Sequence, residues 1–382
     1  MTTTINNEHK KLNVPNIRFP EFHGEWEEYR IEDITVNISS GRCKSHSSNG
    51  KYNLYGSTGI IGKTDEACYE GNLVLVARVG ANAGSLQIIN EPCGITDNTL
   101  IIKPKKVDAQ YIYYFLQHFN LNRLIFGSGQ PLITGSMLKK VKISLGNIQE
   151  QNKLTRLLSL LDERIATQSK IIEELKKLKS AIIEKVFNGK HSEKLQLNDV
   201  GSYIRGLTYS SNDVVEHGGT LVMRSNNIVN GSLLDYNNNV VFVNKQMSAE
   251  QQLQNGDVVI CMANGSSSLV GKSSFYDDSC HSPITVGAFC GIYRSKEPIV
   301  KWLFQTNKYR RYIWNSLQGG NGAIANLNGE DILNMSFSIP NATIKDTCVK
   351  MLTSVDSALE NNMSLCALYT LQKQHLLHQM FI

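Results

Sequence analysis

Apolar residues recur every three or four positions between residues 148 and 187, a stretch with no proline or glycine. This spacing predicts one long amphipathic α-helix. Asn147, with Glu150 three residues later, is suited to cap its start, and Gly189 to end it. At 1.5 Å per residue such a helix is roughly 60 Å long. No small globular domain needs that length, so we predict a coiled coil or spacer.

The chain contains this element twice. A second segment aligns with the first without gaps at a constant offset of 194 residues, which pairs Asp162 with Asp356 and Lys179 with Lys373. The preceding regions correspond more weakly, and Gly71–Leu75 resembles Gly256–Ile260 at an offset of 185. Because the offset drifts only outside the helices, we predict a fixed scaffold with divergent loops, as expected of variable binding regions.

The regions before each helix mix short strand-like runs with Gly, Asn and Ser loops. The runs are LVLVARVG, TLIIKP, TLVMRSN, NNVVFV and DVVICMANG, and aromatic-rich helices are expected at 110–124 and 299–317. This mixture predicts an α+β fold. The expected architecture is two globular domains joined by two long antiparallel coiled-coil helices, with an internal pseudo-twofold repeat. The predicted divisions are a first head at 1–144, a central helix at 145–190, a second head at 191–338 and a C-terminal helix at 339–382.

The heptad pattern predicts how the two helices meet. The expected seam residues are Leu154, Leu161, Gln168, Leu175 and Ile182 in the first helix and Cys348, Val355, Asn362, Tyr369 and Leu376 in the second. Each seam holds one strongly polar residue near its midpoint, Gln168 or Asn362. In an antiparallel pair these two amides face each other and fix the register. The alternative that each sits on a hydrated rim stays open.

Composition narrows the possible functions. The 382 residues carry a net charge of +5, which permits nucleic-acid binding without requiring it. The eight cysteines never stand in C-x-x-C spacing, so we expect reduced thiols and no metal site. The polar N-terminus and the absence of apolar runs near ~20 residues favour a cytoplasmic protein.

Catalytic motifs are missing from the sequence. Gly62-Lys63-Thr64 and Gly271-Lys272-Ser273 resemble the end of a Walker A loop, but serines occupy positions 57 and 266 where its first glycine belongs. No two prolines are adjacent, which excludes an N-P-P-Y methyltransferase motif. We therefore predict a non-catalytic chain; an independent nuclease or ATPase is the disfavoured alternative.

Several motifs together resemble the specificity subunit of a Type I restriction-modification enzyme. They are Val14-Pro15-Asn16-Ile17-Arg18-Phe19-Pro20 followed by Trp26 and Tyr29, Tyr55-Gly56-Ser57-Thr58-Gly59-Ile60-Ile61-Gly62, Gly256-Asp257-Val258-Val259, and Ile148-Gln149-Glu150-Gln151. The resemblance covers nearly the whole chain, including the order head, helix, head, helix. The second helix departs from it, because Ala342-Thr343-Ile344-Lys345 stands in place of the Ile148–Gln151 motif. That departure weakens the expectation of an equivalent docking contact there.

The resemblance implies a function in defence against foreign DNA. Each head would be a target-recognition domain reading one half of a bipartite double-stranded DNA target, and the helices would set the spacer. The helices would also dock two modification subunits, which are adenine-N6 methyltransferases, and two ATP-dependent restriction subunits would join. The complex would use S-adenosylmethionine, ATP and Mg, and this chain would bind no cofactor. A two-headed protein-interaction scaffold without a DNA role is the alternative.

Arg, Lys, Asn, Gln and Ser are the residue types that contact phosphates and base edges, and glycine lets the backbone approach a ligand closely. The candidate DNA contacts are Arg42, Lys44, Lys63, Arg78, Asn82 and Gln130 in the first head and Arg224, Asn226, Asn227, Asn264, Ser266, Lys272 and Asn321 in the second. Ordinary surface turns are the alternative reading of these loops.

Overall fold

The computed structural model describes residues 12–43, 49–125, 130–189, 192–236, 238–280, 282–317 and 325–382. The chain divides into two compact units. Unit 1 comprises residues 1–169 and 364–382, and unit 2 comprises residues 170–363. Each unit therefore contains one head together with part of each long helix, around a hydrophobic core of its own.

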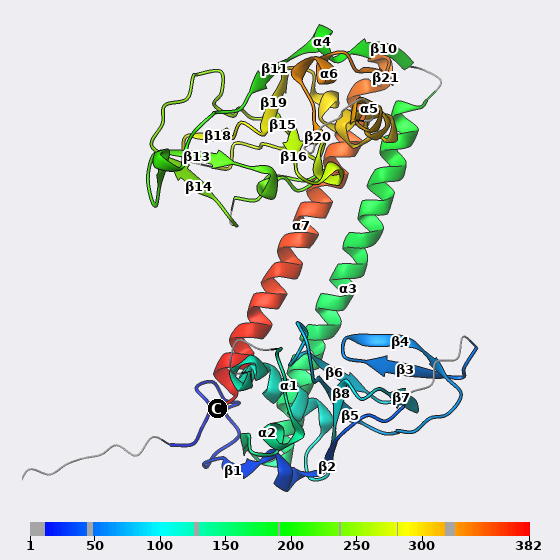
Figure 1. Cartoon of the computed structure of the whole chain (residues 1–382), viewed down its shortest axis with the longest axis vertical. Helices are drawn as coiled ribbons and strands as arrows, with labels where there is room; N and C mark the ends of the chain where they lie inside the picture. The colour runs from blue at the N-terminus through cyan, green and yellow to red at the C-terminus, as the bar shows by residue number, and fades with distance from the viewer. Residues whose placement is uncertain are drawn as a thin grey trace, which may run out of the picture. The chain divides into compact units, whose positions relative to one another are not determined.

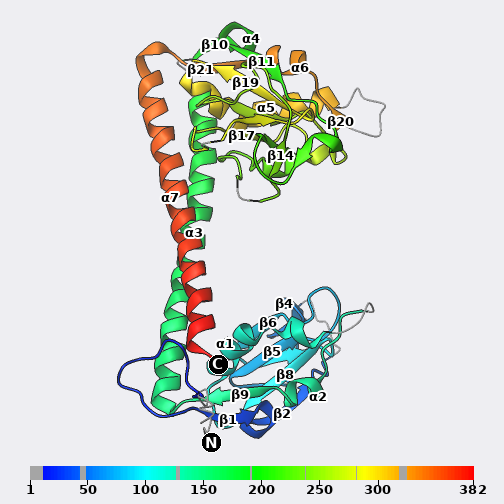
Figure 2. The ribbon, with the colours of Figure 1, turned by 90° about the vertical axis from the view of Figure 1, so that its left-hand side faces the viewer.

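The head of unit 1 is built on two sheets (Figure 2). An antiparallel sheet has the order β2 (Thr35–Ser40), β8 (Thr99–Pro104), β5 (Leu73–Ala77) and β6 (Leu86–Ile89). A second sheet has the order β4 (Gly59–Thr64), β3 (Tyr52–Gly56) and β7 (Cys93–Ile95), of which β3 and β7 run parallel. The remaining elements are the strand pair β1 (Glu27–Arg30) and β9 (Lys142–Leu145), and the helices η1 (Ile31–Ile34), α1 (Ala109–Phe119), η2 (Leu121–Leu124) and α2 (Gly135–Lys139).

The head of unit 2 repeats this plan. Its antiparallel sheet has the order β11 (Gly201–Arg205), β19 (Cys290–Ser295), β15 (Val258–Cys261) and β17 (Ser273–Phe275). Its second sheet has the order β12 (Val214–Val215), β14 (Val241–Val243), β13 (Thr220–Met223) and β18 (Ile284–Val286), with β13 and β18 parallel. Two strand pairs complete the strands, β10 (Ser192–Gln196) with β21 (Ser336–Pro340) and β16 (Ala263–Asn264) with β20 (Ala325–Asn326). The short helices are α4 (Leu197–Val200), η3 (Ser211–Asp213), η4 (Ser225–Asn227), η5 (Ser267–Leu269), η6 (Pro298–Gln305), α5 (Asn307–Leu317) and α6 (Gly329–Leu333).

The matching strand orders confirm the internal repeat and the α+β class. Strand β5 corresponds to β15, as the sequence pairing of Gly71–Leu75 with Gly256–Ile260 predicted. The glycines that open these segments both have left-handed backbones, with φ of +94° at Gly71 and +88° at Gly256. A side chain would strain both turns, so the same residue type is kept in both copies.

The long helices are α3 (Ile148–Phe187) and α7 (Ala342–Met380). Helix α3 has the predicted bounds, and the Oδ1 of Asn147 accepts a hydrogen bond from Glu150 N at 2.9 Å, which confirms the predicted cap. In unit 1 the first half of α3 lies beside the last half of α7, and in unit 2 the other halves pair (Figure 1). The order of contacts is antiparallel, since Asp162 meets Lys373 and, further along α3, Ser169 meets Cys366.

The predicted heptad seam holds in only part of the helices. Leu154 and Leu161 are buried, but Leu175 and Ile182 are only half-buried, and the buried face of α3 in unit 2 passes through Lys179, Ile183 and Phe187 instead. On α7 the predicted seam is half-buried throughout, whereas the fully buried residues are Leu352, Asp356, Leu359, Leu377 and Met380. The heptad prediction erred because each helix packs against a head as well as against its partner.

Both predicted aromatic helices are broken in two. The first is interrupted at Asn120, whose backbone is left-handed at φ 56° and whose side chain caps the following turn. The second is interrupted at Thr306, whose backbone is extended. The Oγ1 of Thr306 caps α5 by accepting a hydrogen bond from Tyr309 N at 3.1 Å. None of the helices in the described ranges is long and apolar enough to cross a membrane.

Candidate nucleic-acid interface and helix anchors

Three loops of the second head converge on one pocket. The loop after β11 supplies Tyr209, the loop after β13 supplies Arg224 and Asn226, and the turn between β18 and β19 supplies Phe289. The pocket has a volume of about 340 Å³, and its lining residues are Tyr209, Arg224, Ser225, Asn226, Gly287, Ala288, Phe289 and Cys290. Asn264 joins the same region because its Nδ2 donates to Ser225 Oγ at 3.3 Å. The structure thus brings together three residues that the sequence singled out, and Arg224 and Asn226 give a mostly apolar pocket groups that can hydrogen-bond to the edge of a ligand.

Arg224 is only partly satisfied by the protein. Its Nη2 donates to the carbonyl of Asn239 at 2.9 Å, while its buried Nε has no hydrogen-bond partner among the described residues. An unpaired buried donor is costly unless something else supplies an acceptor. Arg224 therefore remains a candidate ligand-binding residue.

Asn227 does not suit the role predicted for it. Its side chain is fully buried, its Oδ1 accepts from Arg224 N at 2.9 Å, and its Nδ2 donates to the carbonyls of Asp235 and Asn238. The amide holds the Arg224 loop in shape and has no free edge for DNA. Sequence reasoning erred here because Asn is equally suited to base contacts and to capping turns.

Phe289 and Tyr209 are the pocket residues that sequence reasoning missed. Phe289 is 68% exposed, the largest exposed fraction among the large apolar side chains of the described residues. The chain gives only a weak signal for it, since Gly287-Ala288-Phe289 reads as part of a strand. The side chain is exposed because Phe289 lies in the turn between β18 and β19, and hydrogen bonds to distant segments of the chain define that turn.

Three candidates of the first head, Arg78, Asn82 and Gln130, lie in or beside the loop after β5. Arg78 and Asn82 lie in this loop, and Gln130 is next to Pro131, whose carbonyl accepts from Gly80 N at 3.1 Å. Ile133 N also donates to the carbonyl of Arg78 at 2.8 Å. The Nε of Arg78 is buried without a hydrogen-bond partner among the described residues, as is that of Arg224.

The other candidates are dispersed. Arg42 is exposed beyond β2, and Lys63 lies within β4, where its Nζ donates to Asn53 Oδ1 at 2.8 Å. A Walker A lysine belongs to a glycine-rich loop, whereas Lys63 lies within a strand. Ser266 is exposed, and Lys272 is half-buried just before β17. Lys44 and Asn321 lie outside the described residues.

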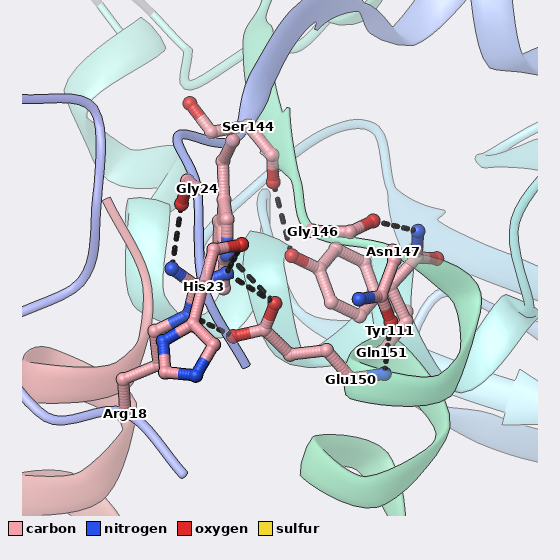
Figure 3. Close-up of polar contacts among 10 residues, drawn as sticks. Arg18, His23, Gly24, Tyr111, Ser144, Gly146, Asn147, Glu150 and Gln151 are labelled. Atoms are coloured by element: carbon pink, nitrogen blue, oxygen red, sulfur yellow. Dashed lines mark hydrogen bonds and ion pairs between the residues drawn. The ribbon is translucent and has the colours of Figure 1, made fainter. Parts of the chain in front are cut away.

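The start of α3 holds a buried ion pair (Figure 3). Glu150 is 2% exposed; its Oε1 accepts from Arg18 Nε at 2.7 Å and its Oε2 from Arg18 Nη2 at 2.8 Å. Trp26 Nε1 also donates to Oε2, at 3.1 Å. The Glu150 contact raises the pKa of Arg18. The carboxylate therefore fastens the N-terminal segment to the helix instead of returning to the Asn147 backbone as in a capping box.

This arrangement divides the Ile148–Gln151 motif. Glu150 and Gln151 are buried, and the Nε2 of Gln151 donates to the carbonyl of Gly146 at 2.8 Å. Only Ile148 and Gln149 are exposed and free to meet a partner protein. Gly146 is needed there, because a Cβ would stand 2.4 Å from Glu150 Oε2.

Each unit fastens its head to its helices through an aspartate. In unit 1 Asp162 binds Lys373 Nζ at 2.6 Å and Tyr114 OH at 2.8 Å. In unit 2 Asp356 binds Lys179 Nζ at 2.6 Å and Trp302 Nε1 at 2.8 Å. We call these two sets the aspartate anchors. The sequence repeat had matched Asp162 with Asp356 and Lys179 with Lys373 without showing that each aspartate pairs with the lysine of the other helix.

The residues of the predicted amide pair are Gln168 and Asn362. Gln168 is buried, and the Nδ2 of Asn362 donates to the carbonyl of Ala358 at 2.6 Å. The proposed meeting of Gln168 with Asn362 stays a prediction.

Helix α7 also exposes an apolar stripe in unit 1. Leu368 and Leu371 are each 60% exposed, and Leu365 is 38% exposed. Residues three apart lie on one face of a helix. Such a stripe suits a protein partner. No group of three or more His, Cys, Asp or Glu residues in the described ranges is arranged to hold a metal ion.

Two repeated α+β heads on paired helices define a class of protein with two binding modules on one scaffold. The family model described as the Type I restriction modification DNA specificity domain matches residues 23–177 and again residues 190–365. The chain therefore belongs to the family of Type I restriction-modification DNA specificity domains.

Relatives and solved structures are consistent with this membership. The MjaVIII specificity subunit of Methanocaldococcus jannaschii is 27% identical over 215 residues, covering 48% of this chain and 50% of that protein. The EcoKI specificity subunit of Escherichia coli is 33% identical over 158 residues, covering 39% of this chain and 31% of that protein. The aligned regions thus span half or less of these relatives. A crystal structure of a Type I restriction-modification S subunit from M. genitalium has a TM-score of 0.68, covers 97% of this chain and 99% of that one, and is 16% identical, which shows a shared fold.

Proposed function

We propose that this chain is the addressing subunit of a Type I restriction-modification complex and that each head reads one half of a bipartite DNA target. The observation that carries the proposal is the repeat itself. Both heads have the same strand order in their antiparallel sheet and the same left-handed glycine before β5 and β15, yet the sequences of the loops beyond those strands differ. A constant scaffold with changed loops is what two different half-sites require. The comparisons give no support to the alternative of an interaction scaffold without DNA.

The rest of the complex supplies the chemistry in this proposal. Two adenine-N6 methyltransferase subunits using S-adenosylmethionine would dock on the helices, and two restriction subunits using ATP and Mg would join them. The exposed Leu365, Leu368 and Leu371 support a protein partner on α7, and Ile148 supports one at the start of α3. The chain itself would bind no cofactor and catalyse no reaction.

The deciding experiment is a genome-wide adenine-methylation profile of the host with and without the gene. We expect deletion to abolish methylation at one asymmetric motif split by an unspecified spacer. If the methyltransferase partner is active and no motif disappears, the proposal is wrong. The wild-type complex should also lose DNA affinity steeply with salt, because phosphate contacts release counterions.

A variant in one head sharpens this test. Arg78→Ala should weaken or relax one half of the motif, by about 1–3 kcal/mol if the guanidinium reads a guanine, and leave the other half unchanged. Lys142→Ala is the matched control, because Lys142 is an exposed cation of the same unit whose salt bridge with Glu28 lies on the β1–β9 pair. A change in both halves would contradict the assignment of one half-site to each head.

A further inference from the structure

The turn between β18 and β19 presents Phe289 on a rigid backbone. Gly287 N donates to Met223 O at 2.9 Å, and Cys290 N closes the turn by donating to Gly287 O at 2.8 Å. The carbonyl of Phe289 accepts from Met262 N at 2.8 Å and from Ala263 N at 3.1 Å. The backbone is therefore fixed before any ligand arrives, while the ring is 68% exposed. A ring held in this way loses little conformational entropy on binding.

The first head has the same turn with a different side chain. There Arg78 N donates to the carbonyl of Asn98 at 2.9 Å, which corresponds to the bond that Met262 N makes to the carbonyl of Phe289 in the second head. Both bonds join the end of the matching strand, β5 or β15, to the turn before β8 or β19. Asn98 is exposed, as is Phe289. One scaffold position thus carries a hydrogen-bonding amide in one head and an aromatic ring in the other.

The surroundings of Phe289 suit a flat, polar-edged ligand. Tyr209 lines the same pocket of about 340 Å³, and Arg224 and Asn226 line it with a guanidinium and an amide. The buried Nε of Arg224 has no hydrogen-bond partner among the described residues, and the side chain lines the pocket beside Asn226. A nucleobase offers a face for stacking on an aromatic ring and acceptors along its edge.

We propose that Phe289 inserts at a base step of the half-site read by the second head and stacks on an unstacked nucleobase, whose edge faces Arg224 and Asn226. The first head, with Asn98 at this position, reads its half-site by hydrogen bonds alone. This inference rests on the proposed function. It adds that the two heads use different chemistry, because an apolar wedge unstacks bases and distorts the duplex where an amide does not.

The test uses the full chain assembled with its methyltransferase partner and duplexes of the target found by methylation profiling. 2-Aminopurine is placed in turn at each position of both half-sites, because its fluorescence rises when it is unstacked. We expect a rise at one position of the second half-site, separate from the rise at the adenine that the methyltransferase modifies. Phe289→Ala should abolish the first signal and keep the second, and Phe289→Trp should keep both.

Affinity provides a second readout. Phe289→Ala should weaken binding roughly 5- to 100-fold, the range expected for loss of one base-stacking contact. Trp314→Ala is the matched control, because Trp314 is an aromatic residue of the same unit that is 66% exposed on α5 and does not line the pocket. It should leave both affinity and fluorescence unchanged. Since both side chains are exposed, neither variant should alter the thermal midpoint.

The outcomes separate the two proposals. Unchanged affinity and unchanged fluorescence in Phe289→Ala, with normal binding by the wild type, would overturn the stacking role and leave the proposed function standing. Absence of sequence-selective, salt-dependent binding by the wild-type complex would overturn the proposed function itself.

Discussion

The two aspartate anchors share an aspartate–lysine pair in different surroundings, and in unit 2 Lys301 Nζ also lies 3.7 Å from Asp356 Oδ2. In unit 2 the side chains of Asp356 and Lys179 are 10% and 8% exposed, and Lys179 also donates to the carbonyl of Gly231 at 2.8 Å. In unit 1 the side chains of Asp162 and Lys373 are 38% and 13% exposed. The indole of Trp302 covers one aspartate where the phenol of Tyr114 reaches the other. The charge pairing is thus common to both copies, whereas its enclosure depends on the head.

Burial changes what the same ion pair does. Desolvation lowers the pKa of Lys179, although Asp356 acts in the opposite direction. A buried pair adds little net stability over an apolar pair, but removal of one partner leaves a charge uncompensated. An exposed pair is screened and contributes little. The unit 2 anchor should therefore tolerate single substitutions less well than the unit 1 anchor.

The largest expected effect is that of Asp356→Ala. It removes the counter-charge of the buried Lys179 and the acceptor of the Trp302 indole, so the free energy of unfolding should fall by about 3–5 kcal/mol. Urea denaturation followed by tryptophan fluorescence measures this change. The double variant Asp356→Asn with Lys179→Met keeps an acceptor for the indole and removes both charges, so it should recover much of the loss. A loss below about 1 kcal/mol in Asp356→Ala would contradict the comparison.

Asp162→Ala should cost less, about 1–2 kcal/mol. The hydroxyl of Tyr114 loses its acceptor, but water can replace a carboxylate that is already 38% exposed. The same denaturation experiment, run side by side with Asp356→Ala, gives the difference directly. Equal losses in the two variants would show that burial does not distinguish the anchors.

Gly146→Ala tests the start of α3 against the start of α7. The new Cβ would crowd Glu150 Oε2 at 2.4 Å and Trp26 Nε1 at 2.7 Å, so we expect a loss of about 1–3 kcal/mol. The equivalent residue before α7 is Pro340, and Ile344, exposed to 41%, stands where Glu150 is buried. Pro340→Ala should therefore be tolerated better. Thermal unfolding of both variants measures the contrast, and a larger loss at Pro340 would refute it.

The smallest expected effect is a pH dependence confined to unit 1. Burial, and then the nearby His378, lower the pKa of His118 below its ordinary value of 6.5. The unfolded chain therefore takes up this proton more readily than the folded chain. Stability from this group should be complete above pH 6.5 and should decline as the pH falls below it. Thermal unfolding between pH 5 and 8 measures this dependence, and His118→Gln should reduce the loss of stability at low pH. The same pH dependence in the variant and the wild type would show that another group causes it.

The sequence predicted the scaffold closely because its signals are local or repeated. The three-four spacing and Asn147 located α3, and the constant offset of 194 revealed the second copy. Strand-like runs located β5, β8, β13, β14 and β15. Backbone hydrogen bonding and periodic burial generate these patterns wherever they occur, so they need no knowledge of distant partners.

The candidate site was harder to predict. Arg224 and Asn226 line one pocket and Asn264 contacts its Ser225, but Asn227 holds the loop from within, and Phe289 went unnoticed. Residue type alone cannot separate an amide that reads a base from one that caps a turn, since both form the same hydrogen bonds.

The sequence by itself determined the repeat, the two long helices, the α+β class and the resemblance to the specificity family. Tertiary structure alone decided that Glu150 is buried in contacts with Arg18 and Trp26. It also decided that Asp162 and Asp356 each bind the lysine of the opposite helix, and that Phe289 is exposed on a hydrogen-bonded turn. The physical reason is common to all three. Periodicity follows from the geometry of a single helix or strand, whereas burial and pairing depend on which distant surface covers each residue.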